Sequence, residues 1–269
     1  MSSLTITTIQ ADLKWEDKKS NLSMFENKIE AIEGHKELVI LPEMYSTGFS
    51  MNTKVLAETM DGESIKWMEE MSKKHKIILT GSLIIEEDGK YFNRLVWMMP
   101  NGHHGYYDKR HLFGYAGEDN FYTSGERRLI TSVNGWKINL QICYDLRFPV
   151  WSRQQVVVGE NDTAPEYDIL IVVANWPAKR SHAWKSLLCA RAIENQCFVV
   201  GVNRVGNDGN GFYHSGDSMI IDPMGEKIYE CSDLENVFTT TLHKDQLEMV
   251  RKTLPFLKDA DSFNIHHQL

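Results

Sequence analysis

The sequence has no apolar run long enough to cross a membrane as a helix. Its longest unbroken apolar stretches, such as Ile169 to Ala174, have the length of a strand, whereas a membrane-spanning helix needs about 20 apolar residues. The opening Met1-Ser2-Ser3 also lacks the charged and then apolar pattern of an export signal. The sequence therefore predicts a cytoplasmic protein that has no membrane partner.

Positive charge is scarce as well. The formal net charge is −8 at pH 7, and no cluster of lysine and arginine is dense enough to reverse that sign locally. Because such a chain repels a phosphate backbone, nucleic acid is excluded as a partner.

Signs of a domain boundary are also missing. The chain contains no low-complexity linker, charge block or Pro-rich hinge, and 269 residues are enough to bury one large core. We therefore predict a single domain over residues 1–269. The polar stretch Gly159 to Glu166 is interpreted as a surface loop, and the irregular tail from about residue 255 to 269 as a candidate oligomer interface.

Cysteine is infrequent, and the four that occur form no Cys-x-x-Cys pair. Since nothing indicates export, all four are expected to be reduced thiols. Cys189 lies in a helical stretch, Cys197 opens an apolar run and Cys231 precedes a polar turn, so these three are interpreted as structural. Cys143 differs from them because it ends a predicted strand.

The motifs of metal and phosphate sites are absent from the sequence. The pairs His103-His104 and His266-His267 are adjacent, whereas two ligands on one helix face are four residues apart. The glycines of Gly206 to Gly211 lack the Lys-Ser/Thr ending of a phosphate loop and are interpreted as a flexible turn. We therefore expect no metal and no cofactor.

What the sequence does contain is an alternation of strand-length apolar runs with helix-periodic segments, which predicts an α/β fold. Asp88-Gly89, Asn101-Gly102 and Asn134-Gly135 separate β-prone stretches and predict hairpins, so antiparallel pairs are mixed in. The predicted strands are Leu4 to Gln10, Glu37 to Leu41, Ile77 to Ile85, Trp136 to Cys143, Asp168 to Asn175, Cys197 to Asn203, Ser218 to Asp222 and Val237 to Leu242; the predicted helices contain Leu22 to Ile32, Glu63 to Lys76, a segment from about Phe148, Ser181 to Gln196 and Lys244 to Leu254.

Three predicted strands end in reactive residues, namely Glu43, Lys109 and Cys143. Ligands of such folds bind where the carboxyl ends of strands open into loops, so these side chains are expected to converge. A carboxylate can take the thiol proton, the thiolate can attack a carbonyl carbon, and an ammonium can neutralise the oxyanion while holding the thiol pKa down. Taken singly, each residue has an ordinary structural explanation, and only their combination indicates hydrolysis.

Cys143 also lies at a predicted junction between a strand and a helix. Backbone N–H groups at a helix start favour a thiolate and can donate to an oxyanion. The N–H of Tyr144 is the nearest such donor.

Segments around these residues resemble the signature segments of the nitrilase superfamily of carbon-nitrogen hydrolases. Their order and spacing agree with that family, and the resemblance implies a catalytic glutamate, lysine and cysteine at Glu43, Lys109 and Cys143. The segments are Leu41-Pro42-Glu43-Met44, Tyr107-Asp108-Lys109-Arg110-His111-Leu112-Phe113 and Cys143-Tyr144-Asp145-Leu146-Arg147-Phe148-Pro149, with further likeness at Ala174 to Pro177, Ala190 to Gln196 and Gly216 to Ser218.

The resemblance implies a four-layer α-β-β-α sandwich whose subunits form a homodimer or a higher homo-oligomer. It also implies a second glutamate in the loop after the lysine, and Glu118 fits that position. Glu118 would hold Lys109 or orient the substrate. The alternative is a solvated loop carboxylate beside Asp119.

Within the superfamily, the chain is most similar to the omega-amidase branch. That likeness implies hydrolysis of a small 2-oxo acid omega-monoamide, 2-oxoglutaramate or 2-oxosuccinamate, to the dicarboxylate and ammonia through a thioester. An anionic substrate needs a cationic anchor, for which Arg180 is a candidate, and Trp176 would form an apolar wall. Alternatively, Arg180 is a solvated residue at the start of a helix, and Trp176 is a tryptophan of the core.

Three other functions remain open at this point. In the first, the same triad hydrolyses a different substrate, namely a nitrile, an N-carbamoyl compound or a larger amide. A non-catalytic binding protein would retain the fold without releasing ammonia. A thiol redox sensor would need a resolving cysteine, Cys189 or Cys197, near Cys143.

Overall fold

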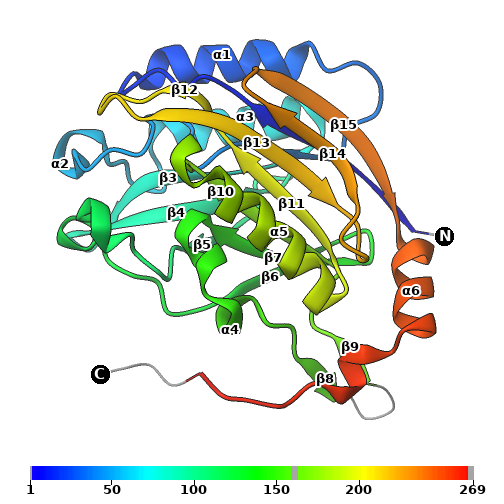
Figure 1. Ribbon diagram of the computed structural model, residues 1–269. Coiled ribbons are helices and arrows are strands. Elements are labelled where there is room, and N and C mark those ends of the chain that lie inside the picture. The colour runs from blue at the N-terminus through cyan, green and yellow to red at the C-terminus, as the bar shows by residue number, and fades with distance from the viewer. Residues whose placement is uncertain (1, 159–162, 266–269) are drawn as a thin grey trace.

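The computed structural model describes residues 2–158 and 163–265. Two β-sheets pack face to face, and helices cover both outer faces (Figure 1). Helices α1 (Lys18–Glu30) and α3 (Glu63–His75) cover the first sheet, and α5 (Ser181–Asn195) covers the second. This confirms the predicted α-β-β-α sandwich.

The first sheet has the strand order β15-β1-β2-β3-β4-β5. Strands β1, β2 and β3 pair in parallel, and β15 pairs with β1 antiparallel. The hairpins β3-β4 and β4-β5 are antiparallel, as Asp88-Gly89 and Asn101-Gly102 predicted. Strands β2 and β5 therefore run in the same direction and end at the same edge. The strands are β1 Ser3–Gln10, β2 Leu38–Ile40, β3 Ile78–Glu87, β4 Lys90–Met98, β5 His104–Asp108 and β15 Asn236–His243.

The second sheet has the order β12-β13-β11-β10-β7-β6, with β14 paired to β13. Strands β7, β10 and β11 are parallel, and the hairpin at Asn134-Gly135 joins β6 to β7 as predicted. The strands are β6 Leu129–Val133, β7 Trp136–Ile142, β10 Ile169–Ala174, β11 Phe198–Asn203, β12 Val205–Asn207, β13 Tyr213–Ile221 and β14 Lys227–Ser232.

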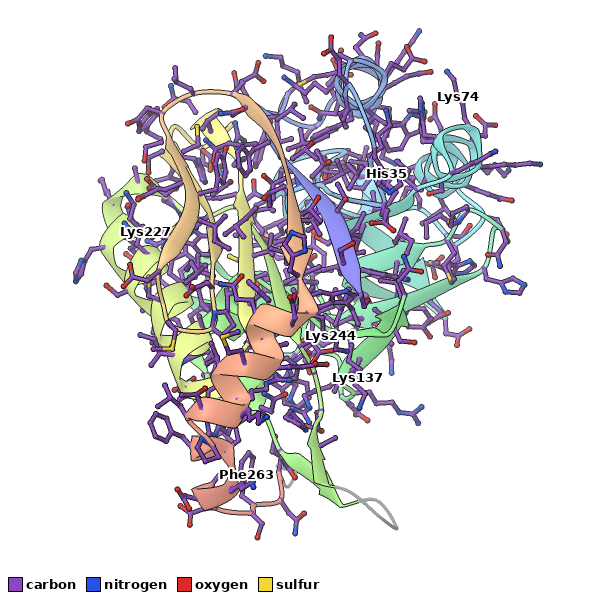
Figure 2. The ribbon with its side chains drawn as sticks, turned by 90° about the vertical axis from the view of Figure 1, so that its right-hand side faces the viewer. His35, Lys74, Lys137, Lys227, Lys244 and Phe263 are labelled. Atoms are coloured by element: carbon purple, nitrogen blue, oxygen red, sulfur yellow. The ribbon has the colours of Figure 1, made fainter. Side chains whose placement is uncertain are left out.

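Helix α6 (Lys244–Thr253) closes the edge at which β7 and β10 begin. Asp168, directly before β10, accepts hydrogen bonds from Lys244 at 3.0 Å, from Arg251 at 2.8 Å and from the backbone N–H of Lys137 at 3.0 Å. Figure 2 shows Lys137 and Lys244 on this side of the molecule. The carboxyl ends of β7 and β10 lie at the opposite edge, which α6 does not cover.

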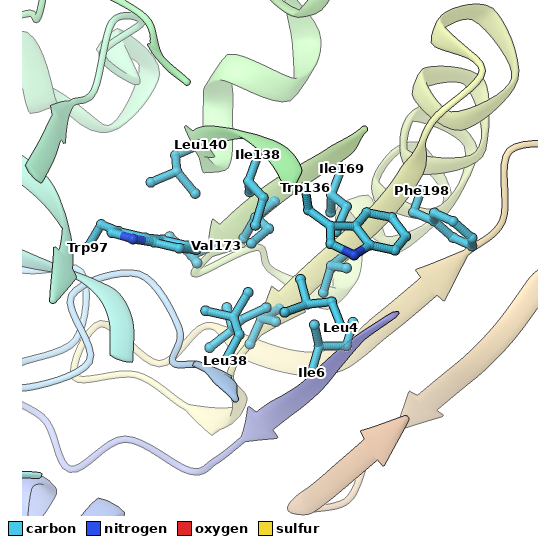
Figure 3. Packing of buried hydrophobic residues seen from close by; sticks show 14 of the residues in the cluster. Leu4, Ile6, Leu38, Trp97, Trp136, Ile138, Leu140, Ile169, Val173 and Phe198 are labelled. Atoms are coloured by element: carbon cyan, nitrogen blue, oxygen red, sulfur yellow. The ribbon is translucent and has the colours of Figure 1, made fainter. Parts of the chain in front are cut away.

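The apolar residues of each strand alternate between two cores. Leu4 and Ile6 point between the sheets toward residues such as Ile138 (Figure 3), whereas Ile9 of the same strand packs under the helices. Because both faces of the central strands are buried, these strands have continuous apolar sequences.

Several predicted elements differ from the structure. The helix predicted from about Phe148 is only the single turn α4 (Pro149–Ser152), preceded by a 3₁₀ helix at Cys143–Arg147. The segment interpreted as a loop before Glu166 includes strand β9 (Thr163–Pro165), which pairs with β8 (Val156–Val158). After α4 the chain therefore continues into the strand pair β8-β9 and does not extend the predicted helix.

The glycine-rich segment is also more ordered than a turn, because Val205–Asn207 forms strand β12. Gly206 has a φ of 81° there, a conformation that glycine adopts without steric cost.

The pair His266-His267 and residues 159–162 lie outside the described residues. Within the described ranges, no helix combines the length and apolar character that crossing a membrane requires. The remaining short helices are α2 Thr53–Leu56, η1 Gly114–Ala116, η2 Glu118–Asn120, η4 Ala178–Arg180 and η5 Phe256–Asp259.

Candidate active site

The three predicted catalytic residues meet at the carboxyl ends of the strands. Glu43 follows β2, Lys109 follows β5 of the same sheet, and Cys143 follows β7 of the facing sheet. The ammonium of Lys109 lies 3.0 Å from Oε1 of Glu43 and 2.9 Å from both carboxylate oxygens of Glu118. Glu43, Lys109 and Glu118 are all fully buried, so Glu118 is not a solvated loop residue.

Two asparagines complete the surroundings of Glu43. The side chain of Asn93, in β4, donates to Oε1 at 2.8 Å and faces Glu118 at 3.4 Å. The backbone N–H of Asn175 donates to Oε2 at 2.7 Å. Each oxygen of the buried Glu43 carboxyl group is therefore hydrogen-bonded, as a buried polar group requires.

Cys143 lies in a tight turn with a positive φ of 47°. Non-glycine residues rarely adopt this conformation, and it is frequent at functional sites. The turn directs the thiol toward Glu43 on one side and into a cavity of about 470 Å³ on the other. Met44, directly after Glu43, has a positive φ of 44° as well, so both reactive residues adjoin strained backbone.

The charges of the site favour the neutral thiol. Burial raises the pKa of Cys143 well above its usual value, and the carboxylate of Glu43 raises this pKa further, both by its charge and by accepting the thiol hydrogen. Lys109 acts in the opposite direction but is outweighed. The prediction that the ammonium and the helix start hold the thiol pKa down is therefore wrong in its net direction.

The same burial acts on the ion pair beside the thiol. Burial by itself would lower the pKa of Lys109, but the carboxylates of Glu118 and Glu43 raise it above the ordinary value. Burial raises the pKa of Glu118, and Lys109 opposes that rise. The site thus brings together the Lys109 ammonium, the carboxyl groups of Glu43 and Glu118 beside it, and a thiol whose raised pKa favours its protonated form and for which Glu43 is the adjacent base.

The cavity in front of Cys143 is lined by aromatic and cationic side chains. Tyr144 and Trp176 form part of its wall. The guanidinium of Arg147 lies 4.8 Å from the ring centre of Trp176, and that of Arg180 lies 5.2 Å from the ring centre of Phe113. Among the described residues neither guanidinium has an ion-pair partner, in contrast to buried arginines elsewhere such as Arg94 and Arg204.

The structure thus brings together every predicted site residue and adds others. Trp176 is both buried and part of the cavity wall, and its indole N–H donates to the carbonyl of Arg180 at 2.9 Å. Asn93, Asn175 and Arg147 were not among the site residues predicted from the sequence. A polar residue inside the apolar strand β4 was the available signal for Asn93, and the interval of four residues from Cys143 was the signal for Arg147.

Comparison with known proteins agrees with this geometry. The model of the family "Carbon-nitrogen hydrolase" matches residues 5–252. This chain belongs to the carbon-nitrogen hydrolase family. The hydrolase is 40% identical over 266 residues to "Omega-amidase YafV" of Yersinia enterocolitica, a match that covers 98% of this chain and 99% of that protein.

Two further relatives cover almost the whole hydrolase. The "2-oxoglutaramate amidase" of Bacillus subtilis is 32% identical over 259 residues, which are 95% of this chain and 96% of that protein. The crystal structure of a CN-hydrolase superfamily protein from Xanthomonas campestris, which carries an arsenic adduct in its active site, has a TM-score of 0.96 and 42% identity, covering 99% and 100% of the two chains. These matches support a cysteine-dependent amidase that hydrolyses carbon-nitrogen bonds other than peptide bonds.

Proposed function

We propose that the hydrolase is an omega-amidase that cleaves the terminal amide of a small 2-oxo acid monoamide. Its preferred substrate is 2-oxoglutaramate, with 2-oxosuccinamate as a shorter analogue, and its products are the dicarboxylate and ammonia. The names of the relatives from Yersinia enterocolitica and Bacillus subtilis support this substrate class.

The observation that carries the proposal is that Cys143 lines one cavity together with Arg147 and Arg180, neither of which has an ion-pair partner in the part of the chain that the structure describes. Arg147 and Arg180 each lie over an aromatic ring, and no ion pair with another described residue occupies their N–H groups. A guanidinium binds a carboxylate through two parallel hydrogen bonds, which orients the bound molecule as well as attracting it. A short substrate with a carboxylate at one end would present its amide to the thiol.

In the first half of the proposed reaction, Glu43 takes the proton of Cys143 while the sulfur attacks the amide carbon. The ammonium of Lys109 and the backbone N–H of Tyr144 stabilise the oxyanion. An ammonium has three N–H groups, so one N–H shared by the two oxygens of Glu118 and one directed to Glu43 would leave the third for the oxyanion. Glu43 then returns its proton to the leaving nitrogen, ammonia departs, and a thioester on Cys143 remains.

In the second half, Glu43 removes a proton from water, and the resulting hydroxide attacks the thioester carbon. The carbon–sulfur bond breaks, the dicarboxylate is released, and the proton held by Glu43 returns to the sulfur of Cys143. One buried base therefore serves both steps. No step requires a metal or a cofactor.

Ammonia release from 2-oxoglutaramate tests the proposal, with glutamine, asparagine, an N-carbamoyl compound and a simple nitrile as comparison substrates. We expect the oxo-amide to be turned over fastest. If only one of the other compounds is hydrolysed, the assignment of the catalytic residues stands and 2-oxoglutaramate is rejected as the substrate. Ammonia release from none of them would favour a non-catalytic binding protein.

Substitution of the two cavity arginines tests the anchor separately. We expect Arg147→Met and Arg180→Met to raise KM for 2-oxoglutaramate, each by about tenfold or more, since a charge-assisted hydrogen-bond pair is lost. Arg127→Met is the matched control, because Arg127 is exposed and does not line the cavity. Unchanged KM in both cavity variants would exclude them as the anchor.

We further propose a single domain over residues 1–269, a cytoplasmic location and a homodimer or higher homo-oligomer. Exposed apolar side chains support the oligomer: Ile193 of α5 is 55% exposed and lies against Gly225, whose neighbour Met224 is 49% exposed. Sedimentation of the purified protein and of Ile193→Glu tests it, and a monomer in both samples would reject it.

A further inference from the structure

We propose that Asp145 is a positioning residue of the active site, because its carboxylate ties the turn that carries Cys143 to the segment that carries Lys109. The inference rests on the proposed roles of these two residues. Asp145 itself lines no part of the cavity, so it would act through them.

The carboxylate of Asp145 is fully buried and accepts from both segments. Its Oδ2 accepts from the backbone N–H of Ile142 at 3.0 Å and from the hydroxyl of Tyr107 at 2.7 Å. Its Oδ1 accepts from the backbone N–H of His111 at 2.9 Å and faces Nδ1 of that ring at 2.8 Å. Residues directly before Cys143 and on both sides of Lys109 are thus attached to one side chain.

The direction of three of these four contacts is fixed, namely those from the backbone N–H groups of Ile142 and His111 and from the hydroxyl of Tyr107. The Tyr107 oxygen already accepts from the indole N–H of Trp151 at 2.9 Å and from the backbone N–H of Arg110 at 3.2 Å. Its own proton is therefore directed to Asp145. Backbone N–H groups cannot reverse, so each carboxylate oxygen accepts from at least one fixed donor, and an amide in place of the carboxylate would set its NH₂ against one of them.

This attachment bears directly on the reaction geometry. Cys143 has a positive φ, a conformation that persists only where the surrounding structure fixes it. Asp145 holds Ile142, the residue directly before Cys143. Lys109 lies between Tyr107 and His111, which the same carboxylate holds. A displacement of about 1 Å between a nucleophile and its partners can cost on the order of a hundredfold in rate.

Asp145→Asn tests the proposal because it keeps the shape of the side chain. We expect kcat to fall about a hundredfold while KM stays within about threefold, since Arg180 lies on a separate element, η4, that Asp145 does not contact. Asp168→Asn is the matched control: Asp168 is also buried and also accepts a backbone N–H, but at the opposite edge of the sheet. An equal loss of kcat in both variants would reduce the role of Asp145 to general stability.

Alkylation of Cys143 by iodoacetamide gives a readout that needs no substrate. The rate is followed on the peptide that contains Cys143, since the other three cysteines are free thiols too. Loss of positioning predicts slower alkylation in Asp145→Asn, because the thiol is displaced from Lys109, whose charge lowers the pKa of Cys143. Removal of a negative charge without displacement predicts faster alkylation and would overturn the proposal.

These two readouts keep the proposal separate from the substrate. If 2-oxoglutaramate is not hydrolysed, the alkylation result still decides whether Asp145 positions Cys143. Should Asp145→Asn fail to fold, Tyr107→Phe removes only one of the four contacts of the Asp145 carboxylate. We expect it to lower kcat and the alkylation rate by about tenfold, and wild-type values of both would contradict the proposal.

Discussion

The ammonium of Lys109 lies 2.9 Å from each carboxylate oxygen of Glu118. The backbone N–H of Phe113 donates to the same carboxylate at 2.6 Å, so the loop between Lys109 and Glu118 is closed by its own functional groups. Glu43 holds the ammonium from the other side. The ammonium of Lys109 is therefore held between Glu43 and Glu118, and a substitution of either residue should change its position.

The first prediction concerns Glu118. Glu118→Gln keeps the size of the side chain but removes one of the two charges that hold Lys109, and we expect kcat to fall on the order of tenfold to a hundredfold. Asp119→Asn is the matched control, because Asp119 is the exposed neighbour in the same loop. Equal rates in the two variants would return Glu118 to a structural role.

The second prediction concerns Lys109. Lys109→Met should lower kcat about a hundredfold or more, comparable to the loss of an oxyanion donor. It should also destabilise the fold by about 3–5 kcal/mol, because Glu43 and Glu118 would be buried without a counter-charge. Denaturant unfolding and ammonia release are the measurements. A variant with wild-type kcat and stability would show that the buried ion pair contributes to neither.

The third prediction concerns the pKa of the nucleophile. Because Glu43 raises the pKa of Cys143 and Lys109 lowers it, Glu43→Gln should shift the alkylation profile of Cys143 to lower pH and Lys109→Met should shift it to higher pH. Alkylation rates measured across the alkaline range test both. Shifts in the same direction in both variants would contradict the assigned charges.

The raised pKa of Cys143 also predicts how stability depends on pH. In the unfolded chain the thiol ionises near 9.0, whereas the folded state keeps its proton to higher pH. Stability from this group is therefore fully present below pH 9.0 and is lost as pH rises toward the folded pKa, with a slope of up to about 1.4 kcal/mol per pH unit. The difference in unfolding free energy between the wild type and Cys143→Ala should decrease above that pH. A constant difference would show that the folded pKa is not raised.

The fold was predictable where the sequence pattern reports burial. Strands such as β10 and helices such as α5 were found to within a residue or two, since both faces of the strands and one face of the helix are apolar. Short elements such as β12 and β9 were missed. Three residues hold too little periodicity to separate a strand from a turn.

The site was predictable in its residue types but not in its electrostatics. Glu43, Lys109 and Cys143 follow strands, and their motifs placed them together. The net pKa shift of Cys143 depends on burial and on the sum of three charges, which require coordinates. Asn93 and Asp145 illustrate the same point, because their importance lies in which donors and acceptors they meet across the sheets.

The covalent role of Cys143 is tested most directly by trapping the acyl group during turnover of 2-oxoglutaramate with hydroxylamine, in the wild type and in Cys143→Ala. We predict that the wild type releases ammonia and forms the hydroxamate of the dicarboxylate, which a thioester on Cys143 yields, and that Cys143→Ala forms neither while keeping its fold. Ammonia release at a near-normal rate from Cys143→Ala would contradict the account, because the nucleophile would then be another group.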